Sequence, residues 1–418
     1  MANFSGLSGE ASAAVVIAAT LDTKAEEIGF LRRALEHQGV SVLLIDCGIL
    51  GEPGIAPDVT RAEVASRGGG SIEALRARRD RENGLRVMTA GLTSILKTML
   101  AEGRIGGYIG VGGGTNAAFA AAAFKVLPFG LPKFLVSTLA SGNTRPFIGA
   151  KDVVLFHTVV DVLGLNPFLR TVFEQTAAAM AAMLKSHATA AEPDPRTTIG
   201  MTTFGSTTEG AMRALARIGS SAEVLTFHAR GTGGEAMEDM IREGRISAVL
   251  DLTTTEIADE LVGGMCSAGP ERLTAAGEMG IPQVVLPGAI DLVNFGTREQ
   301  VPARFQGRRF VAHTALATLM RTTPDENGEI ARYMARRLNQ ARGPVSVVVP
   351  TRGYSAYSVQ GAPFFDPEAD AAFLAALKAS LKPEIPIATV DDTINGELCI
   401  NSAVSALQEM MRSQAEKV

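Results

Sequence analysis

The chain has 418 residues, of which 46% are hydrophobic and 20% are charged, and its formal net charge is -5. This composition excludes an intrinsically disordered protein, and the acidic balance argues against non-specific nucleic-acid binding, which needs a basic surface. A chain of this length exceeds one ordinary hydrophobic core, so we expect two domains.

Cysteine usage and the N-terminal sequence indicate the cytoplasm. The three cysteines, Cys47, Cys266 and Cys399, are far apart and form no C-x-x-C pair, so neither a disulfide framework nor a thiolate zinc site is indicated. Residues 1–20 contain no Lys or Arg, unlike a signal peptide. No apolar run reaches the ~18 residues that span a bilayer. We therefore expect a cytoplasmic protein with no membrane or nucleic-acid partner.

Short apolar runs alternate with helical patterns along the first half of the chain. The expected strands are residues 14–19, 40–46, 107–111, 133–137 and 153–156, and the expected helices are residues 25–37, 85–102, 116–126 and 168–185. Residues 52–81 are polar, and their glycine run at 68–70 indicates an exposed loop without a ligand. Strands separated by helices of this length predict βαβ units and a parallel sheet.

A second α/β segment follows a short polar stretch. Residues 186–196 are polar and contain proline, which is typical of a linker. The pattern then restarts with expected strands at residues 198–204, 223–227, 246–250, 283–286, 309–312 and 345–349, and expected helices at 209–218, 234–243, 329–341 and 402–415. The predicted fold class is α/β, with two Rossmann-like domains, residues 1–190 and 197–418, each built on a mainly parallel sheet.

The most informative loop follows the expected strand at residues 107–111. Gly112, Gly113 and Gly114 come directly after it, and Thr115 and Asn116 open a helix. Glycines let backbone N–H groups approach a ligand closely, and a helix N-terminus adds unpaired donors and a positive dipole end. We expect this turn to bind phosphate, although no Lys follows as in a Walker A motif. The alternative is a tight turn with Thr115 or Asn116 as the helix cap.

Three strand ends in the second half have a similar composition. Gly205 and Thr207 follow one strand, Gly233 follows the next, and Thr254 follows a strand that ends at Asp251. Ordinary helix capping accounts for any one of these loops. Because the carboxyl ends of parallel strands share one edge, where ligands bind, we expect the loops to converge on one cleft. If the domains do not face each other, the loops form two clefts.

Two further loops complete the expected cofactor site. Lys24 follows the first strand and is the cation expected to reach a phosphate, the alternative being an exposed lysine in a first helical turn. Asp22 either holds Mg²⁺ or caps the helix that follows it. Ser141 and Gly142 follow the strand at residues 133–137 and would add hydrogen-bond donors.

The residues expected to move protons lie in the second half. His228 ends a strand and has a side chain suited to acid–base work, the alternative being a satisfied, partly buried ring. Glu235 lies nearby in the sequence. Asp251 ends a buried strand, so we expect it to point into the cleft, where it is a second candidate Mg²⁺ ligand. No two histidines have the spacing of a zinc helix and no G-x-S-x-G elbow occurs, so we assign no metal-ligand set and no serine hydrolase.

Seven longer motifs occur along the chain: TLDTK (20–24), GVGGGTN (110–116), STLASGN (137–143), FHARGTGGEAME (227–238), VLDLTTTEIADELVGG (249–264), PGAIDLVNFG (287–296) and LMRTTPDEN (319–327). They resemble the bacterial and plant family of ATP-binding domains whose namesake is the tomato mosaic virus resistance protein. The resemblance extends from about residue 15 to beyond residue 403. It implies ATP binding, a two-domain Rossmann-like architecture and a homodimer. It also implies a site in the strand-end loops, led by Lys24 and residues 112–116.

Three functions remain open from the sequence. The first is an enzyme of small-molecule metabolism that uses ATP with an unidentified phosphorylated substrate in an interdomain cleft, which the many polar strand ends favour. The second is a nucleotide-regulated binding module without turnover, which the lack of a Walker motif and of an obvious nucleophile favours. The third is a nucleotide-sugar or sugar-phosphate enzyme made of two facing Rossmann-like domains.

Overall fold

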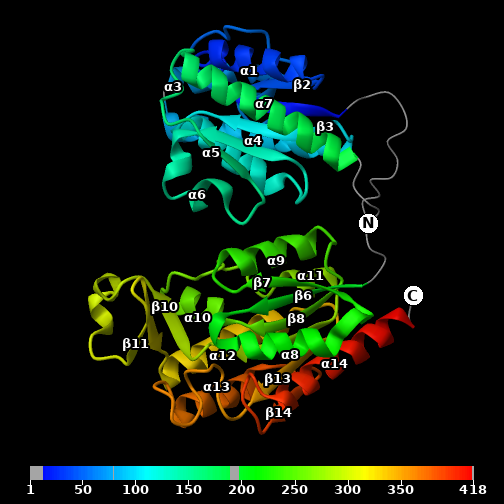
Figure 1. The fold of residues 1–418 in the computed structure, drawn as a ribbon, viewed down its shortest axis with the longest axis vertical. Helices are drawn as coiled ribbons and strands as arrows, with labels where there is room; N and C mark the ends of the chain where they lie inside the picture. Colours follow the sequence, from blue (N-terminus) through cyan, green and yellow to red (C-terminus); the bar gives the residue numbers. More distant parts are fainter. Residues whose placement is uncertain (1–12, 79, 189–196, 417–418) are drawn as a thin grey trace. The chain divides into compact units, whose positions relative to one another are not determined.

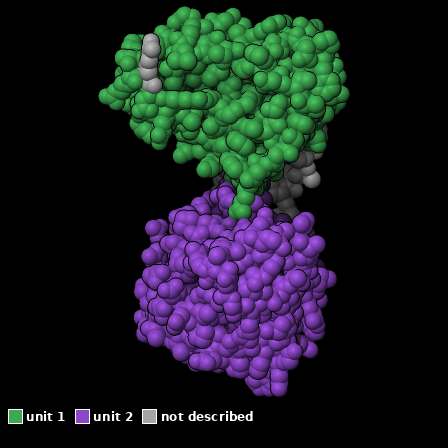
Figure 2. All heavy atoms as spheres, turned by 90° about the vertical axis from the view of Figure 1, so that its left-hand side faces the viewer, with its two compact units in different colours: residues 1–192 green, residues 193–418 purple. Residues whose placement is uncertain are grey.

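The computed structural model describes residues 13–78, 80–188 and 197–416 of the chain. Two compact units divide the chain, residues 1–192 and residues 193–418, called unit 1 and unit 2 below (Figure 2). The linker expected at residues 186–196 falls largely on residues 189–196, which lie outside the described residues. Among the residues that are described, no helix combines the length and apolar character needed to cross a membrane.

Unit 1 is built on a five-stranded parallel sheet with the strand order β2-β1-β3-β4-β5. Its strands are β1 (Ala14–Ala19), β2 (Val42–Asp46), β3 (Ile105–Val111), β4 (Lys133–Ser137) and β5 (Val154–His157). Every residue of β1 is buried. Such continuous apolar strands are typical of a parallel sheet that is covered on both faces.

Helices cover both faces of the unit 1 sheet (Figure 1). The helices α1 (Ala25–His37) and α7 (Pro167–Ala188) pack together on the face that carries Val15 and Ile17. The face that carries Val16 packs against α2 (Arg61–Arg67), α3 (Ile72–Arg78), α4 (Arg81–Ala101) and α5 (Gly114–Val126). A short helix, α6 (Arg145–Ile148), follows β4.

The glycine run at residues 68–70 forms the turn between α2 and α3, with Gly69 exposed as expected, but the helices at residues 61–67 and 72–78 were not predicted. A Cβ on Gly68 would lie 2.0 Å from the carbonyl oxygen of Val87, and a Cβ on Gly91 would lie 1.8 Å from that of Val64. Only glycine at both positions lets α2 approach α4 this closely. The sequence pattern missed α2 and α3 because their apolar faces are short.

Unit 2 is built on a six-stranded parallel sheet with the order β14-β13-β9-β8-β6-β7. Its strands are β6 (Thr198–Thr203), β7 (Glu223–His228), β8 (Ala248–Thr253), β9 (Gln283–Gly288), β13 (Val345–Pro350) and β14 (Ile387–Val390). One face packs against α8 (Thr208–Ile218) and α14 (Glu397–Ala415). The other packs against α9 (Thr232–Arg242), α10 (Thr255–Val262), α11 (Ala275–Met279), α12 (Pro324–Leu338) and α13 (Pro367–Ser380).

A small antiparallel sheet is inserted between β9 and α12. It consists of β10 (Leu292–Phe295), β11 (Phe310–Thr314) and β12 (Ala317–Arg321), in the order β10-β12-β11. The strand expected at residues 309–312 therefore exists but lies outside the parallel sheet, and β10 and β12 were not expected. The large sheets are both parallel, so the predicted class of two Rossmann-like α/β domains is confirmed.

Candidate functional site

The strand order of each large sheet reverses beside its first strand. In unit 1, β1 is followed by β2 on one side and β3 on the other, and in unit 2, β6 is followed by β7 on one side and β8 on the other. The helices after the two central strands then leave toward opposite faces and open a crevice beyond the carboxyl ends of the strands. Unit 1 therefore has a crevice between the ends of β1 and β3, and unit 2 has one between the ends of β6 and β8; they are called the β1/β3 and β6/β8 crevices below.

The triglycine turn lies at the β1/β3 crevice. Gly112 donates its N–H to Val136 at 3.0 Å and has φ of 115°, a conformation that favours glycine. Gly113 precedes α5 and Gly114 begins it; a Cβ on either would meet no other described atom within 4 Å. Across the described chain, the N–H groups of residues 113–116 find no hydrogen-bond partner. The turn therefore presents unpaired donors to open space.

The N-terminus of α5 lacks the groups that usually neutralise a helix end. Its first turn contains no acidic residue, and no described side chain caps it. Arg81, at the start of α4, donates from its guanidinium to the Thr115 hydroxyl at 3.2 Å. By contrast, α1 carries Glu26 and Glu27 in its first turn. The positive end of α5 and an arginine thus lie together without a compensating acid in that turn.

Asn116 connects the triglycine turn to the loop after β1. Its side chain is 5% exposed; it accepts the Thr20 N–H at 3.2 Å and donates to the Thr20 hydroxyl at 3.4 Å. These contacts hold the two sides of the crevice at a fixed spacing. Asn116 therefore positions the site through its side chain and offers only its backbone N–H to a ligand.

Lys24 and Asp22 hold neighbouring loops in place. Lys24 Nζ donates to the carbonyl oxygen of Val162 and lies 3.9 Å from a Glu27 carboxylate oxygen. Asp22 accepts the N–H groups of residues 50 and 51, both at 3.1 Å, through one oxygen. Both side chains border the crevice, but the structure gives each a tethering role. Arg81, which the sequence pattern did not single out, is the cation that contacts the α5 terminus.

Ser141 and Gly142 lie in the exposed turn after β4. The Ser141 hydroxyl donates to the Thr138 carbonyl at 3.2 Å, and the Gly142 N–H donates to the Leu139 carbonyl at 3.1 Å. Both donors are therefore used within the turn itself. The turn borders the end of β4, which neighbours β3 in the sheet.

The β6/β8 crevice in unit 2 is filled by the chain itself. The hydroxyls of Thr207 and Thr253 lie 2.7 Å apart, and Thr254 donates its hydroxyl to the Leu286 carbonyl at 3.0 Å. The carbonyl of Ser206 accepts the N–H of Ala356 at 3.1 Å. Gly205 is exposed, but Thr207, Thr253 and Thr254 are fully buried. These hydroxyls serve internal packing.

Asp251 belongs to a buried ion network and does not point into an open cleft. Its two oxygens accept from the Arg272 guanidinium at 2.6 and 2.7 Å, and one also accepts the Thr202 hydroxyl at 2.7 Å. Arg272 also binds Glu256 at 2.7 Å and Glu238 at 3.4 Å. Burial raises the pKa of Glu256 and of Glu238, against the opposing effect of Arg272. Nothing in the sequence around Arg272 signals this role.

The loop after β7 joins the same network. Glu256 accepts the N–H groups of Gly231 and Gly234 at 2.7 and 3.0 Å. A Cβ on Gly233 would lie 1.9 Å from the carbonyl oxygen of His228, so Gly233 is required for backbone packing. The His228 ring is exposed and stacks on Phe204, with ring centroids 5.4 Å apart. Glu235 lies half-buried in the first turn of α9.

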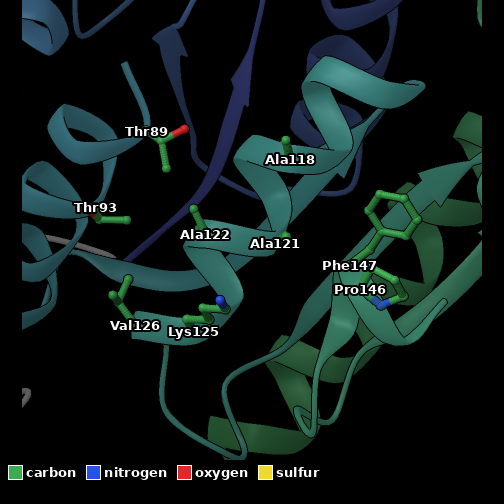
Figure 3. A pocket seen from close by; sticks show the side chains of 9 residues that line it. All are labelled: Thr89, Thr93, Ala118, Ala121, Ala122, Lys125, Val126, Pro146 and Phe147. Carbon is green, nitrogen blue, oxygen red and sulfur yellow. The ribbon is translucent and has the colours of Figure 1, made fainter. Parts of the chain in front are cut away.

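A shallow groove of about 440 Å³ runs along α5 between α4 and α6 (Figure 3). Small side chains form most of it, and Lys125 is its one charged group; the lining residues are Thr89, Thr93, Ala118, Ala121, Ala122, Lys125, Val126, Pro146 and Phe147. It lies on the side of the helix, so its lining does not include the free N–H groups of residues 113–116. Within the described part of the chain, no three His, Cys, Asp or Glu side chains form a group that could hold a metal ion.

Comparison with known proteins identifies two family domains. Residues 13–189 match the N-terminal domain, and residues 196–411 the C-terminal domain, of the uncharacterised protein family UPF0261. A UPF0261 protein of Clostridium tetani is 42% identical over 399 residues, covering 95% of this chain and 98% of that protein. The tomato ToMV resistance protein Tm-1(GCR237) is 41% identical over 288 residues, covering 68% of this chain and 38% of that protein.

Two solved structures resemble the chain distantly. A UDP-N-acetylglucosamine 2-epimerase from Rickettsia bellii is 9% identical with a TM-score of 0.22, covering 96% of each chain. The glycosyltransferase SnogD from Streptomyces nogalater is 12% identical with a TM-score of 0.20, covering 96% of this chain and 100% of that one. Likeness at this level carries no conclusion about ligand or reaction.

Proposed function

Because the chain belongs to the uncharacterised protein family UPF0261, we propose its function from the site itself: the β1/β3 crevice of unit 1 binds a nucleoside triphosphate, with ATP as the first candidate. The phosphates would lie on the N–H groups of residues 113–116. The motif resemblance described above favours ATP over other phosphorylated ligands.

The observation that supports this proposal is the uncompensated N-terminus of α5. Its unpaired N–H groups face open space beside Gly113 and Gly114, its first turn lacks an acid, and Arg81 lies against Thr115. A helix N-terminus favours an anion by about 0.3–1 kcal/mol through its dipole alone. Hydrogen bonds from N–H groups to a charged phosphate add about 1.5–3 kcal/mol each. A multiply charged phosphate chain fits these donors.

The aspartates expected to hold Mg²⁺ are engaged in other contacts. Asp251 binds Arg272 with both oxygens, and Asp22 binds two backbone N–H groups with one oxygen. We therefore assign Mg²⁺ no ligand from either side chain. A magnesium ion would enter the site as part of the metal–triphosphate complex, where it neutralises phosphate charge.

Binding without turnover is the form of the proposal that the unit 1 crevice favours. Of the expected acid–base residues, Asp251 is committed to Arg272. Turnover of ATP with a small-molecule substrate is the second candidate, favoured by the exposed position of His228 at the end of β7. A cytoplasmic location and a homodimer, both expected above, are part of the same proposal.

Isothermal titration of the full-length protein with Mg–ATP tests the site. We expect Arg81→Ala to weaken ATP binding about three- to tenfold, because one charge-assisted contact to phosphate is lost. Arg104→Ala is the matched control. Arg104 is also exposed, but it directly precedes β3 and so lies at the opposite edge of the sheet.

The outcomes of this titration are distinct. Loss of affinity in the Arg81 variant alone supports the site, and the difference should shrink at high salt because an exposed charge is screened. Equal affinity in both variants and the wild type contradicts it. Release of phosphate from ATP, measured in the same samples, decides between binding alone and turnover.

A further inference from the structure

The segment at residues 158–166 crosses the carboxyl edge of the unit 1 sheet. It leaves β5 at one end of the sheet and enters α7, which packs beside α1. On the way, the Thr158 N–H donates to the Ser137 carbonyl at the end of β4, at 3.4 Å. The Val162 carbonyl then accepts from Lys24, which follows β1. This crossing segment therefore forms a wall of the β1/β3 crevice.

Leu163 is held by polar contacts on both sides, yet its own side chain does not pack. The preceding carbonyl accepts from Lys24, and the following N–H, from Gly164, donates to Glu27 at 2.8 Å. Glu27 is 3% exposed, so this anchor is buried. The Leu163 side chain is nevertheless 76% exposed. The chain fixes the position of this leucine and leaves its apolar surface in solvent.

Two more apolar side chains are exposed to solvent on anchored segments of the chain. Val159, on the crossing segment, is 64% exposed and has φ of 59°, which is unfavourable for a β-branched residue. Leu50 is 80% exposed and lies on the loop after β2, where its N–H donates to Asp22 at 3.1 Å. The loop at residues 20–24 thus anchors both segments, through Asp22 on one and Lys24 on the other. We call Leu50, Val159 and Leu163 the apolar rim.

Single exposed apolar residues are normal on protein surfaces. The apolar rim differs because its members lie on segments anchored to the loop at residues 20–24, which Asn116 joins to the triglycine turn through its contacts with Thr20. An inorganic phosphate would use only those donors and would leave the rim in water. A ligand that joins a phosphate chain to a flat, largely apolar group would use both, and pre-positioned side chains reduce the entropy that binding costs.

We propose that the apolar rim contacts the nucleobase of a nucleotide whose phosphates lie on the N–H groups of residues 113–116. This inference rests on the proposed function, because it needs the phosphates at the α5 terminus. It assigns Leu163, Val159 and Leu50 as binding residues that distinguish a nucleotide from a bare polyphosphate.

Titration of the full-length protein with Mg–ATP and with Mg–tripolyphosphate tests the inference. We expect the wild type to bind ATP at least about tenfold more tightly than tripolyphosphate, since only ATP buries the rim. Leu163→Ser should weaken ATP binding about tenfold and leave tripolyphosphate binding unchanged. Leu316→Ser is the matched control, because Leu316 is 74% exposed and lies in unit 2.

The possible results separate the two proposals. Equal affinity of the wild type for ATP and tripolyphosphate overturns the nucleobase contact while the phosphate site stands. Unchanged ATP affinity in Leu163→Ser also overturns the nucleobase contact. If the same variant changes the oligomeric state of the protein, measured by analytical ultracentrifugation, the apolar rim is instead a contact between copies of the chain. If neither ligand binds the wild type, the proposed function fails and this inference fails with it.

Discussion

Replacing Gly113 by valine should remove nucleotide binding and leave the fold intact. Gly113 precedes α5 with φ of −84° and ψ of −155°, an extended conformation with negative φ that does not require glycine. A Cβ at this position meets no other described atom within 4 Å. We therefore expect the free energy of unfolding to fall by less than about 1 kcal/mol, as for an unfavourable residue at a helix cap.

The expected loss of binding is much larger than the loss of stability. The added isopropyl group would occupy the open space beside the unpaired N–H groups of residues 113–116. If a phosphate can no longer reach two of these donors, binding loses about 3–6 kcal/mol, at about 1.5–3 kcal/mol for each charge-assisted hydrogen bond. This corresponds to a dissociation constant about 10²–10⁴-fold higher.

A thermal-shift titration measures this effect directly. ATP at 100 times its dissociation constant stabilises the native state by about 2.7 kcal/mol, which raises the melting temperature of a unit of this size by about 5–10 °C. Gly113→Val should show no shift. Gly205→Val is the comparison, because Gly205 is also exposed and open and precedes a helix of unit 2. A retained shift in Gly113→Val, or a shift lost only in Gly205→Val, refutes the placement at α5.

Two further predictions concern the stability of unit 2. Arg272→Met should lower the free energy of unfolding, measured by urea titration, by about 3–5 kcal/mol, because it leaves Asp251 and its neighbouring carboxylates buried without a counter-charge. The control is Arg242→Met, which removes a partly exposed ion pair and should lower the free energy of unfolding by less than about 1 kcal/mol. Burial raises the pKa of Asp259 and that of Asp370 from 3.8 to about 7, so the folded state binds more protons than the unfolded state between these values. Stability should therefore fall as pH rises from about 4 to 7, by up to about 1.4 kcal/mol per pH unit for each group, and a urea midpoint that rises from pH 5 to pH 7 would contradict this.

The sequence predicted the two large sheets well because their strands are buried on both faces. A run such as residues 14–19 is apolar throughout, and its pairing with parallel neighbours needs no alternation. The small antiparallel sheet was harder to predict. The strand β10 has only four residues, and β12 ends in Arg321, which pairs with the distant Asp370.

Two loops with similar sequences differ in the contacts that their polar groups make in the structure. Residues 112–116 and residues 205–208 have similar compositions, so sequence alone gave them the same expected role. In the structure, the Thr207 hydroxyl pairs with that of Thr253 and the following helix α8 carries Glu209 in its first turn, whereas the first turn of α5 carries no acid. Partners such as Thr253 and Arg81 lie more than thirty residues away in the sequence from the groups they contact. Such contacts leave no local pattern.

Two crevices with the same topology therefore need not share a function. The reversal of strand order opens space at β1/β3 and at β6/β8, but the chain fills the second through the contact between Ala356 and Ser206. A ligand can bind only where donors remain unpaired, because displacing an existing buried hydrogen bond costs about as much as the new one returns. We propose the phosphate site in unit 1, because the first turn of α5 carries no acid, whereas the first turn of α8 in unit 2 carries Glu209. The buried ions around Arg272 then act on unit 2 by joining the loop after β7 to the ends of β6 and β8.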